Sequence, residues 1–307
     1  MNIFVTGAGG YIGGSVAAAL LASGHRVRGL TRSDTSAKRL AACGIEPVIG
    51  ALDDAGLLAR EARASDGVIN TASADHAGAV EALITGLEGS TKPLLHTSGS
   101  SVIGDDARGA RMSEQVFDGE TPLVVNPAKQ PRRDIDLRVL GAAARGVRSA
   151  VICPSLIYGV GKGLNPHSVQ IPFLVHNARA CGRVQIVGPG LNVWSNVHID
   201  DIADLYLLAL AKAPAGAFYF AENGEASFGE LAAAIARRLG LPGVESLPPE
   251  VAAQRWGEPK AYFSLGSNSR VRATRARREL GWTPRHASLI DWVLSEMPVD
   301  HDPTSAS

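Results

Sequence analysis

The chain has 307 residues, of which 45% are hydrophobic, so it can bury a sizeable core as one large domain or as a domain with a smaller lobe. Its 30 lysines and arginines equal its 30 aspartates and glutamates, and this balance argues against a nucleic-acid-binding protein, which usually carries a basic field. No apolar run reaches the ~18 residues that a membrane span requires, so we expect no membrane partner.

The cysteines and the first residues indicate a cytoplasmic protein. Cys43, Cys153 and Cys181 are widely spaced and odd in number, which fits reduced thiols better than a disulfide framework. No basic segment followed by an apolar one, as in a secretory signal, stands at the N-terminus. No group of His, Cys or carboxylate residues has metal-ligand spacing, so we also expect no metal site.

The first two dozen residues predict a strand, a glycine-rich turn and a helix, in that order. Residues 2–6 form a short apolar run with β-branched side chains, as in a buried parallel strand. Residues 15–23 are rich in alanine and leucine and predict a helix, which Gly24 ends. Strand, glycine turn and helix together are the context that a dinucleotide-binding fingerprint requires.

Three glycines of the turn have separate physical roles. Gly7 permits a tight turn out of the strand, Gly10 lets the backbone approach a pyrophosphate, and Gly13 lets the helix pack close to the sheet. The helix N-terminus then offers free N–H groups and a partial positive charge to the phosphates. The alternative is a glycine-rich turn without a ligand, but the position between a strand and a helix favours a dinucleotide site.

The end of the second expected strand, residues 26–31, favours NADP over NAD. Proteins with this fold that prefer NAD usually place an acidic residue there, to accept a hydrogen bond from the ribose 2′-hydroxyl. This chain has Thr31, Arg32 and Ser33 at that point, and Asp34 follows too late. A guanidinium group matches a 2′-phosphate, so Arg32 favours NADP, although an ordinary exposed arginine is the alternative.

Strands and helices then alternate with short loops up to residue 98, and this alternation predicts a doubly wound parallel sheet with its ligand crevice at the carboxyl ends of the strands. The expected segments are a helix over 36–43, a strand over 46–50, a helix over 54–64, a strand over 68–72, a helix over 76–89 and a strand over 93–98.

The pattern loosens after residue 98. Residues 99–126 are polar and contain glycine, which predicts loops, and residues 132–145 predict a helix that Gly146 ends. A strand follows over 147–153, before Pro154. Further helices are expected over 171–181, 200–213, 227–239, 275–280 and 289–297, with strands over 184–187 and 218–221.

Five segments, taken together, resemble the extended short-chain dehydrogenases/reductases, the NAD-dependent epimerase/dehydratase family. They are residues 6–13, 96–98, 154–159, 196–203 and 276–284, and they span nearly the whole chain in the family's order. The resemblance implies an α/β fold, with a Rossmann doubly wound parallel sheet that binds NAD(P) and a smaller C-terminal α/β substrate lobe. We expect the Rossmann domain over 1–163 and 192–226, the lobe over 164–191 and 227–297, and a disordered tail over 298–307.

The family's usual catalytic residues are missing from their positions. Family members carry a Ser or Thr after the fifth strand and a Tyr-x-x-x-Lys motif on the next long helix, in which the tyrosine exchanges a proton with the substrate. Here the tyrosine position falls near Ala128, the lysine position near Arg132 and the serine position on Gly99, while Asp136 matches an acidic residue that often follows. Arginine cannot act as a general base at neutral pH, so the usual mechanism is not available.

Two smaller departures concern the cofactor: Ala51 stands where an adenine-contacting Asp is common, with Asp53 close by, and Asn70 stands where His is common. The fingerprint and the resemblance together imply a set of cofactor contacts. They are Gly7, Gly10, Tyr11, Ile12, Gly13, Thr31, Arg32, Ser33, Leu52, Asp53, Thr71, Ala72, Ser73, Thr97, Ser98, Pro154, Ser155 and Leu156.

Four residues are candidates for the chemistry in place of the missing pair. Tyr158 follows the sixth strand, although tyrosine at this position mostly packs in the family. Ser98 and Ser100 could hydrogen-bond a substrate carbonyl or simply cap the end of a strand. Arg132, with its neighbours Lys129 and Arg133, could bind an anionic group or form a solvated basic turn.

These observations predict an NADP-preferring oxidoreductase of a small carbonyl compound or related metabolite, with non-standard catalytic residues. The missing motif keeps a second class open, a catalytically impaired NADP-sensing regulatory protein. A sugar-nucleotide epimerase or dehydratase is a third, and the missing tyrosine counts against it. Family members often form homodimers through the helices expected here over 76–89 and 132–145.

Overall fold

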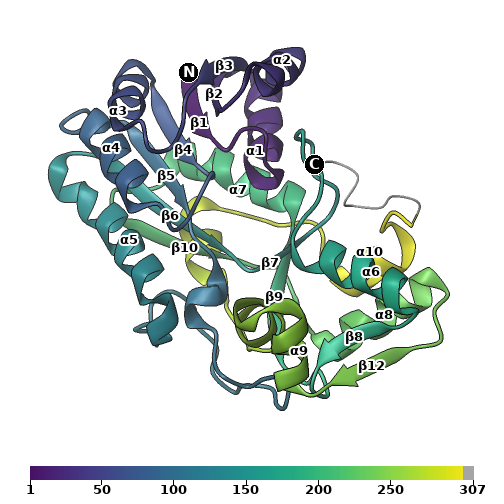
Figure 1. Cartoon of the computed structure of the whole chain (residues 1–307). Helices are drawn as coiled ribbons and strands as arrows, with labels where there is room; N and C mark the ends of the chain where they lie inside the picture. The colour runs from purple at the N-terminus through teal and green to yellow at the C-terminus, as the bar shows by residue number, and fades with distance from the viewer. Residues whose placement is uncertain (300–307) are drawn as a thin grey trace.

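The computed structural model describes residues 1–299, and they form a large parallel sheet with a smaller lobe beside it (Figure 1). The large sheet has the strand order β10-β6-β5-β4-β1-β2-β3, and all its neighbouring pairs are parallel. Its strands are β1 (Asn2–Thr6), β2 (Arg26–Thr31), β3 (Glu46–Ile49), β4 (Gly67–Asn70), β5 (Pro93–Thr97), β6 (Arg148–Pro154) and β10 (Ala217–Ala221). The expected doubly wound α/β fold is confirmed.

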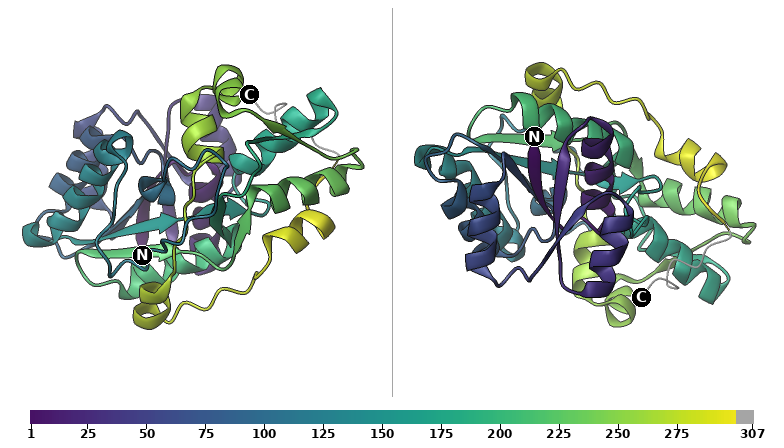
Figure 2. Two further views of the ribbon diagram at one scale, coloured as in Figure 1. Left: turned by 90° about the horizontal axis from the view of Figure 1, so that it is seen from below. Right: turned by 90° about the horizontal axis from the view of Figure 1, so that it is seen from above.

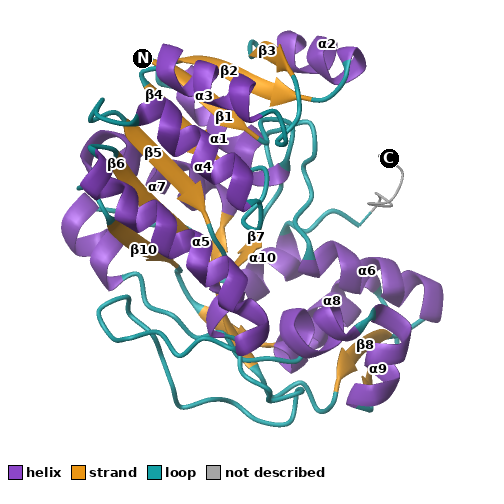
Figure 3. Ribbon diagram, turned by 60° about the vertical axis from the view of Figure 1, so that its left-hand side comes forward, coloured by secondary structure: helices purple, strands orange, loops and turns teal. Residues whose placement is uncertain are grey.

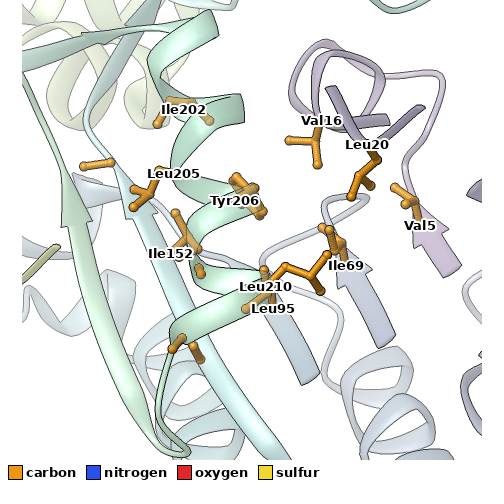
Figure 4. Close-up of a cluster of buried hydrophobic side chains, with 14 of the residues drawn as sticks. Val5, Val16, Leu20, Ile69, Leu95, Ile152, Ile202, Leu205, Tyr206 and Leu210 are labelled. Atoms are coloured by element: carbon orange, nitrogen blue, oxygen red, sulfur yellow. The ribbon is translucent and has the colours of Figure 1, made fainter. Parts of the chain in front are cut away.

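Helices cover both faces of this sheet, which is why its strands are apolar on both sides. They are α1 (Tyr11–Ala22), α2 (Asp34–Ala42), α3 (Ala55–Ala64), α4 (Ala77–Leu87), α5 (Gln130–Gly141) and α7 (Ile199–Lys212). Leu20 of α1 and Tyr206 of α7 share one buried cluster with Val5 and Ile69 of the sheet (Figure 4). Residues of α3, α4 and α5 fill a second cluster on the opposite face.

The strand order reverses between β1 and β4, because the chain adds β2 and β3 on one side of β1 and every later strand on the other. At such a switch point the loops that leave the two strands diverge, and a ligand crevice opens at their carboxyl ends. The sheet therefore places its crevice beside the glycine turn that follows β1.

The smaller lobe contains two short sheets and four helices around a third buried cluster (Figure 3). One sheet pairs β7 (Leu156–Tyr158), β9 (Val193–His198) and β11 (Glu225–Ser227), and the other pairs β8 (Val184–Val187) with β12 (Val244–Leu247). The helices are α6 (Gln170–Cys181), α8 (Phe228–Leu239), α9 (Pro249–Trp256) and α10 (Leu289–Ser295). Short helical segments occur at Ser100–Ile103, Pro127–Lys129, Ala142–Arg145, Pro259–Leu265 and Ala276–Leu280.

The chain passes between the two parts several times. Residues 276–282 lie within the range expected for the lobe, yet Ala276, Leu280 and Trp282 pack in the cluster under α1 and α7. Figure 2 follows this yellow segment from a short helix beside the large sheet to α10 in the lobe. The domain boundaries remain a prediction. The expected disordered tail lies, apart from residues 298 and 299, outside the described residues.

Three further expectations concern the surface and the thiols. Within residues 1–299, no helix is long and apolar enough to cross a membrane. Cys43 and Cys181 are exposed and Cys153 is buried, and all three thiols are free. A homodimer through α4 and α5 stays a prediction.

The contact between Gly13 and the preceding turn gives a test of the fold. A methyl group at position 13 would lie 2.2 Å from the carbonyl oxygen of Gly7 and 2.3 Å from the hydroxyl oxygen of Thr71. We expect Gly13→Ala to lower the free energy of unfolding by about 1–3 kcal/mol, because the packed backbone segments must move apart to make room for the methyl group. Urea unfolding measures the change.

Gly141→Ala is the matched control, since Gly141 lies at the end of α5 with no atom near its missing side chain. It should leave stability unchanged or raise it by up to about 1 kcal/mol, because alanine favours the helix. Equal stability of the Gly13→Ala variant and the native protein would contradict this account of the turn.

Candidate active site

The glycine turn between β1 and α1 leaves backbone N–H groups free at a helix end. Gly7 has a φ of +74°, in the left-handed region that favours glycine, and its carbonyl accepts a 2.8 Å hydrogen bond from the N–H of Gly10. Gly10 is the N-cap of α1, and no side chain caps the helix. The free N–H groups and the helix dipole can therefore hold an anionic group such as a phosphate.

A cavity of about 1160 Å³ opens beside this turn. It extends from the turn past the end of β2 to the loop after β3, and the lobe forms part of its wall. Eight of the residues expected to contact a cofactor line it, namely Gly7, Gly10, Thr31, Arg32, Ser33, Leu52, Asp53 and Ala72. The structure thus brings together the residues expected at the phosphate and adenosine end of the crevice.

The other expected cofactor contacts do not line this cavity. They are Tyr11, Ile12, Gly13, Thr71, Ser73, Thr97, Ser98, Pro154, Ser155 and Leu156. Some of them bond to the protein's own backbone: the Tyr11 hydroxyl donates to the Gly159 carbonyl at 2.9 Å, and the Ser155 hydroxyl to the Ala221 carbonyl at 3.0 Å. Their roles toward a cofactor remain predictions.

Two cations and two hydroxyl groups gather at the end of β2. Arg32 and Ser33 line the cavity as the sequence predicts, and Ser36 and Arg39 join them from α2. Ser33 is the N-cap of α2 and its hydroxyl accepts a 3.2 Å hydrogen bond from the N–H of Ser36. Sequence reasoning missed Ser36 and Arg39. Their spacing of three residues, which places both on one side of a helix, was the available signal.

The lobe supplies the opposite wall, of which sequence reasoning identified only His167 as a residue that could line a cleft. Its contribution is Leu164, Asn165, His167, Ser168, Pro172, Phe173 and His176. The loop of residues 159–165 lies directly on the glycine turn: the N–H of Asn165 donates to the Gly9 carbonyl at 3.2 Å, and the N–H of Lys162 to the Ser15 hydroxyl at 3.0 Å. This segment, called here the cover loop, fixes the lobe against the turn.

A second polar group lies where Asp53 meets α4. His76 lines the cavity and caps α4, with its Nδ1 accepting from the N–H of Ala79 at 3.0 Å. Its Nε2 lies 3.1 Å from a carboxylate oxygen of Asp53. The expected Asp53 contact thus comes with a histidine that the sequence did not reveal.

Arg132 lies beside Gly99, the position of the missing catalytic serine. A side chain at Gly99 would begin 3.6 Å from Nη1 of Arg132. Asp75 holds this guanidinium in a bidentate pair, with Nε to Oδ1 at 2.8 Å and Nη2 to Oδ2 at 2.6 Å, and Nη1 donates to Ser101 Oγ at 3.1 Å. The hydrogen bond from Arg132 holds the pKa of Asp75 below its usual value. The charge is therefore oriented, and part of its donor capacity remains free.

A row of buried polar side chains crosses the sheet nearby. The Thr6 hydroxyl donates to Asn70 Oδ1 at 2.5 Å, and Asn70 Nδ2 lies 2.9 Å from His96 Nδ1. Nε2 of His96 is buried without a hydrogen-bond partner. Burial, with Arg132 close by, lowers the pKa of His96 to about 4, so the ring is neutral at physiological pH.

Ser98 forms a buried pair with Asp136 at the carboxyl end of β5. The Ser98 hydroxyl donates to Asp136 Oδ2 at 3.0 Å, while Oδ1 has no partner and the carboxyl group is fully buried. Burial raises the pKa of Asp136 to about 6, although Ser98 and Arg133 favour the charged form. The buried thiol of Cys153 lies beside them, and burial also raises its pKa.

The structure places two catalytic candidates away from the crevice. Tyr158 is fully buried in the lobe, its hydroxyl donates to the His286 carbonyl at 3.0 Å, and burial raises its pKa. The Ser100 hydroxyl accepts a 2.7 Å hydrogen bond from Ser269 and is also buried. Both geometries favour structural roles, so Ser98, directly after β5, and Arg132, on α5, remain the catalytic candidates.

One group of side chains within the described residues has the composition of a metal site. His198, Asp200 and His286 have potential ligand atoms within 4.8 Å of one another. The two histidine rings are stacked, with centroids 3.8 Å apart, so their in-plane lone pairs cannot converge on one point. Asp200 is paired with Lys162 at 2.8 Å, and His198 Nδ1 accepts from the N–H of Asp200. This arrangement favours a structural role.

The sheet and its crevice define a Rossmann-like α/β fold, and a family model identifies the class of protein. The model of the NAD dependent epimerase/dehydratase family matches residues 3–219. The chain therefore belongs to this family, and the resemblance seen in the sequence is confirmed.

The chain is also similar to several curated relatives, and it shares its fold with a solved structure. Oxidase ucsJ from Acremonium is 34% identical over 94% of both chains, and a Schizosaccharomyces pombe protein, C2A9.02, is 33% identical over 96% of this chain and 99% of its own. A ketoreductase from Stigmatella aurantiaca and a UDP-glucose 4-epimerase from Streptomyces lividans match at 26% and 25% identity, each over 93% of this chain and 92% of the relative. The dTDP-glucose 4,6-dehydratase DesIV from Streptomyces venezuelae, solved with NAD, has the same fold (TM-score 0.77, 23% identity, 96% and 95% covered).

The raised pKa of Asp136 makes stability depend on pH. Its neutral form is favoured in the folded protein, so its contribution to stability is full below the ordinary pKa of 3.8 and is lost as the pH rises through about 6. Asp136→Asn cannot ionise. Its free energy of unfolding, relative to the native protein, should therefore rise by on the order of 3 kcal/mol between about pH 4 and pH 7.

Urea unfolding at several pH values measures this difference. Asp134→Asn is the control, since Asp134 lies on the exposed side of the same helix, and its difference from the native protein should not follow the same curve. A pH-independent difference for Asp136→Asn would show that this carboxyl group titrates normally.

Proposed function

We propose that the protein is an NADP-preferring oxidoreductase that reduces a small carbonyl compound. The observation that carries the proposal is the group of Arg32, Ser33, Ser36 and Arg39 on the cavity wall, beside a glycine turn that can hold a phosphate. Membership of an NAD-dependent family supports a nicotinamide cofactor, which would supply the hydride. Ketoreductase and oxidase names among the relatives support redox chemistry.

The preference for NADP rests on charge. Two guanidinium groups face the cavity at the end of β2, where an NAD enzyme usually has a carboxylate. Asp34 lies in the first turn of α2 and does not line the cavity. A dianionic 2′-phosphate gains charge-assisted hydrogen bonds from such a site, whereas a ribose hydroxyl gains little.

Arg132 is the residue that we assign to the carbonyl group. Its orientation by Asp75 costs nothing at the moment of reaction, and a positive donor beside the carbonyl oxygen stabilises the negative charge that develops there. It replaces the hydrogen-bond donors of the missing serine and tyrosine. It cannot release a proton near neutral pH, so the proton must come from another group.

The alternatives from the sequence are an NADP-sensing regulatory protein and a sugar-nucleotide epimerase or dehydratase. The oriented, partly free guanidinium of Arg132 favours an enzyme over a sensor, because a sensor has no need of a donor in that position. The missing tyrosine, which in the family exchanges a proton with a sugar hydroxyl, counts against an epimerase. The free thiols support a cytoplasmic location.

The cofactor preference can be tested by fluorescence titration with NADPH and NADH, using the protein's four tryptophans. We expect NADPH to bind more tightly, and Arg32→Asp to weaken NADPH binding by about tenfold to a hundredfold, since it replaces an attraction to the 2′-phosphate by a repulsion. Arg60→Asp, at an exposed position of α3 outside the cavity, should change neither affinity. Equal affinity for NADPH and NADH in the native protein would remove the NADP assignment.

The role of Arg132 can be tested by NADPH oxidation with a panel of ketones, aldehydes and β-keto acids. Arg132→Met should lower kcat by about 10²–10³-fold, as expected for the loss of a preorganised donor, and leave NADPH affinity nearly unchanged. Arg138→Met, on the exposed side of α5, is the control. NADPH binding by the native protein without turnover of any compound would favour the sensor instead.

A further inference from the structure

The crevice needs a proton donor that the usual motif would have supplied. Resting on the proposed reductase function, we infer that Ser98 delivers the proton to the substrate oxygen and that the buried carboxyl group of Asp136 supplies it through the Ser98 hydroxyl. Asp136 is then a positioning residue, since it acts through Ser98 and does not contact the substrate.

The position of Ser98 supports this role. It follows β5 directly, at the edge where the crevice of such a sheet lies, and it stands one residue before Gly99, the site that Arg132 faces. The residue is mostly buried, with 6% of its surface exposed. The donor to the carbonyl oxygen and the charge that stabilises that oxygen are thus neighbours in the structure.

The hydrogen bond between the two residues can run in either direction, and this is the core of the inference. When Asp136 is ionised, the Ser98 hydroxyl donates to its carboxylate at 3.0 Å and has no proton to offer. When Asp136 is protonated, its O–H donates to Ser98 Oγ, and the Ser98 proton is free to point into the crevice. Only the protonated carboxyl group therefore makes Ser98 a donor.

The surroundings of Asp136 leave both its protonated and its ionised form accessible. The charged and titratable groups that face it are Arg132 and Arg133 from its own helix, Asp75 from the loop after β4, and Cys153 from β6. Arg133 lies 3.9 Å from Oδ2, too far for a hydrogen bond, and Oδ1 has no partner. The carboxyl group is therefore not locked in its ionised form, and burial keeps its pKa at about 6.

Other groups nearby are less suited to release the proton. Arg132 stays protonated, His96 is fully buried and neutral, and burial keeps Cys153 a thiol. Lys129 lies at the start of α5, but its ammonium group is 5.0 Å from the ring centre of Phe263, which it faces. Asp136 is the acid that is hydrogen-bonded to a hydroxyl group at the crevice.

The proposed reaction adds a hydride to the carbonyl carbon and a proton to the carbonyl oxygen. A bound NADPH would supply the hydride that is added to the carbonyl carbon, and the π pair of the C=O bond moves to oxygen. The oxygen takes the hydroxyl proton of Ser98, and Ser98 takes the proton of Asp136, which becomes a carboxylate. After the product leaves, water in the crevice returns a proton through Ser98.

The test is the pH dependence of kcat for NADPH oxidation with the best compound of the carbonyl panel, from about pH 5 to pH 8. In the native protein kcat should fall by about tenfold per pH unit above the pKa of Asp136. Asp136→Asn should lower the plateau by about 10²-fold and lose this pH dependence, while NADPH affinity is unchanged. Asp134→Asn should keep the native profile.

Ser98 provides a second pair of variants in case Asp136→Asn folds poorly. Ser98→Thr keeps the hydroxyl group and should keep the pH dependence, whereas Ser98→Ala should lose it. A native pH profile in Asp136→Asn or in Ser98→Ala would overturn the inference and leave the reductase function standing. NADPH binding without turnover at any pH would overturn both the inference and the reductase function. If Arg132→Met kept the native turnover while Asp136→Asn lost the pH dependence of kcat, only the assignment of Arg132 would be wrong.

Discussion

The structure depends on a close approach of backbone to backbone at the glycine turn. Gly13 brings α1 against the turn at Gly7, and Gly14 brings it against Gly163 of the cover loop, with no room for a side chain in either contact. Because three segments meet there, the helix end is held at the carboxyl edge of the sheet with its N–H groups unpaired. The same glycine contacts therefore stabilise the fold and place the helix end where it can hold a phosphate.

In the proposed mechanism, other residues take over the roles of the family's tyrosine and lysine. A tyrosine and a lysine combine a proton donor with a charge that lowers its pKa. In this chain the charge belongs to Arg132, held by Asp75, and the titratable group is a carboxyl whose pKa is raised by burial. The positive charge and the titratable group belong to different residues, so each depends on its own surroundings. The bidentate ion pair with Asp75 orients Arg132, and burial with one unpartnered oxygen sets the pKa of Asp136.

The sequence predicted the fold well because local signals and the global pattern agree. Apolar strands, helix ends at glycine and the turn after β1 each depend on a few neighbouring residues. The same held for Arg32 and Ser33, which adjoin β2. The contacts that were missed join distant segments. Ser36 and Arg39 lie inside the expected helix, but their place on the cavity wall depends on how α2 packs beside the end of β2. The lobe wall around Phe173 likewise depends on the tertiary packing of α6.

The catalytic candidates also differ in how far local sequence signals could predict their surroundings. The position of Tyr158 after the sixth strand makes it a catalytic candidate, but its side chain lies buried in the lobe because the strand after Pro154 joins β9 rather than the large sheet. The sequence identifies Asp136 only as a match to an acidic residue that is common at this position in the family. Its pairing with Ser98 and its missing second partner are properties of burial, which a single sequence does not reveal.

The cover loop has a consequence for the energetics of the whole molecule. It joins the lobe to the turn by hydrogen bonds at Gly159, Lys162 and Asn165, and the cavity between them is lined from both sides. A ligand in that cavity would contact both parts at once, so its binding free energy would oppose their separation. The resistance of this protein to heat and proteolysis would then rise with ligand concentration, and its degradation would report how much of the ligand surrounds it.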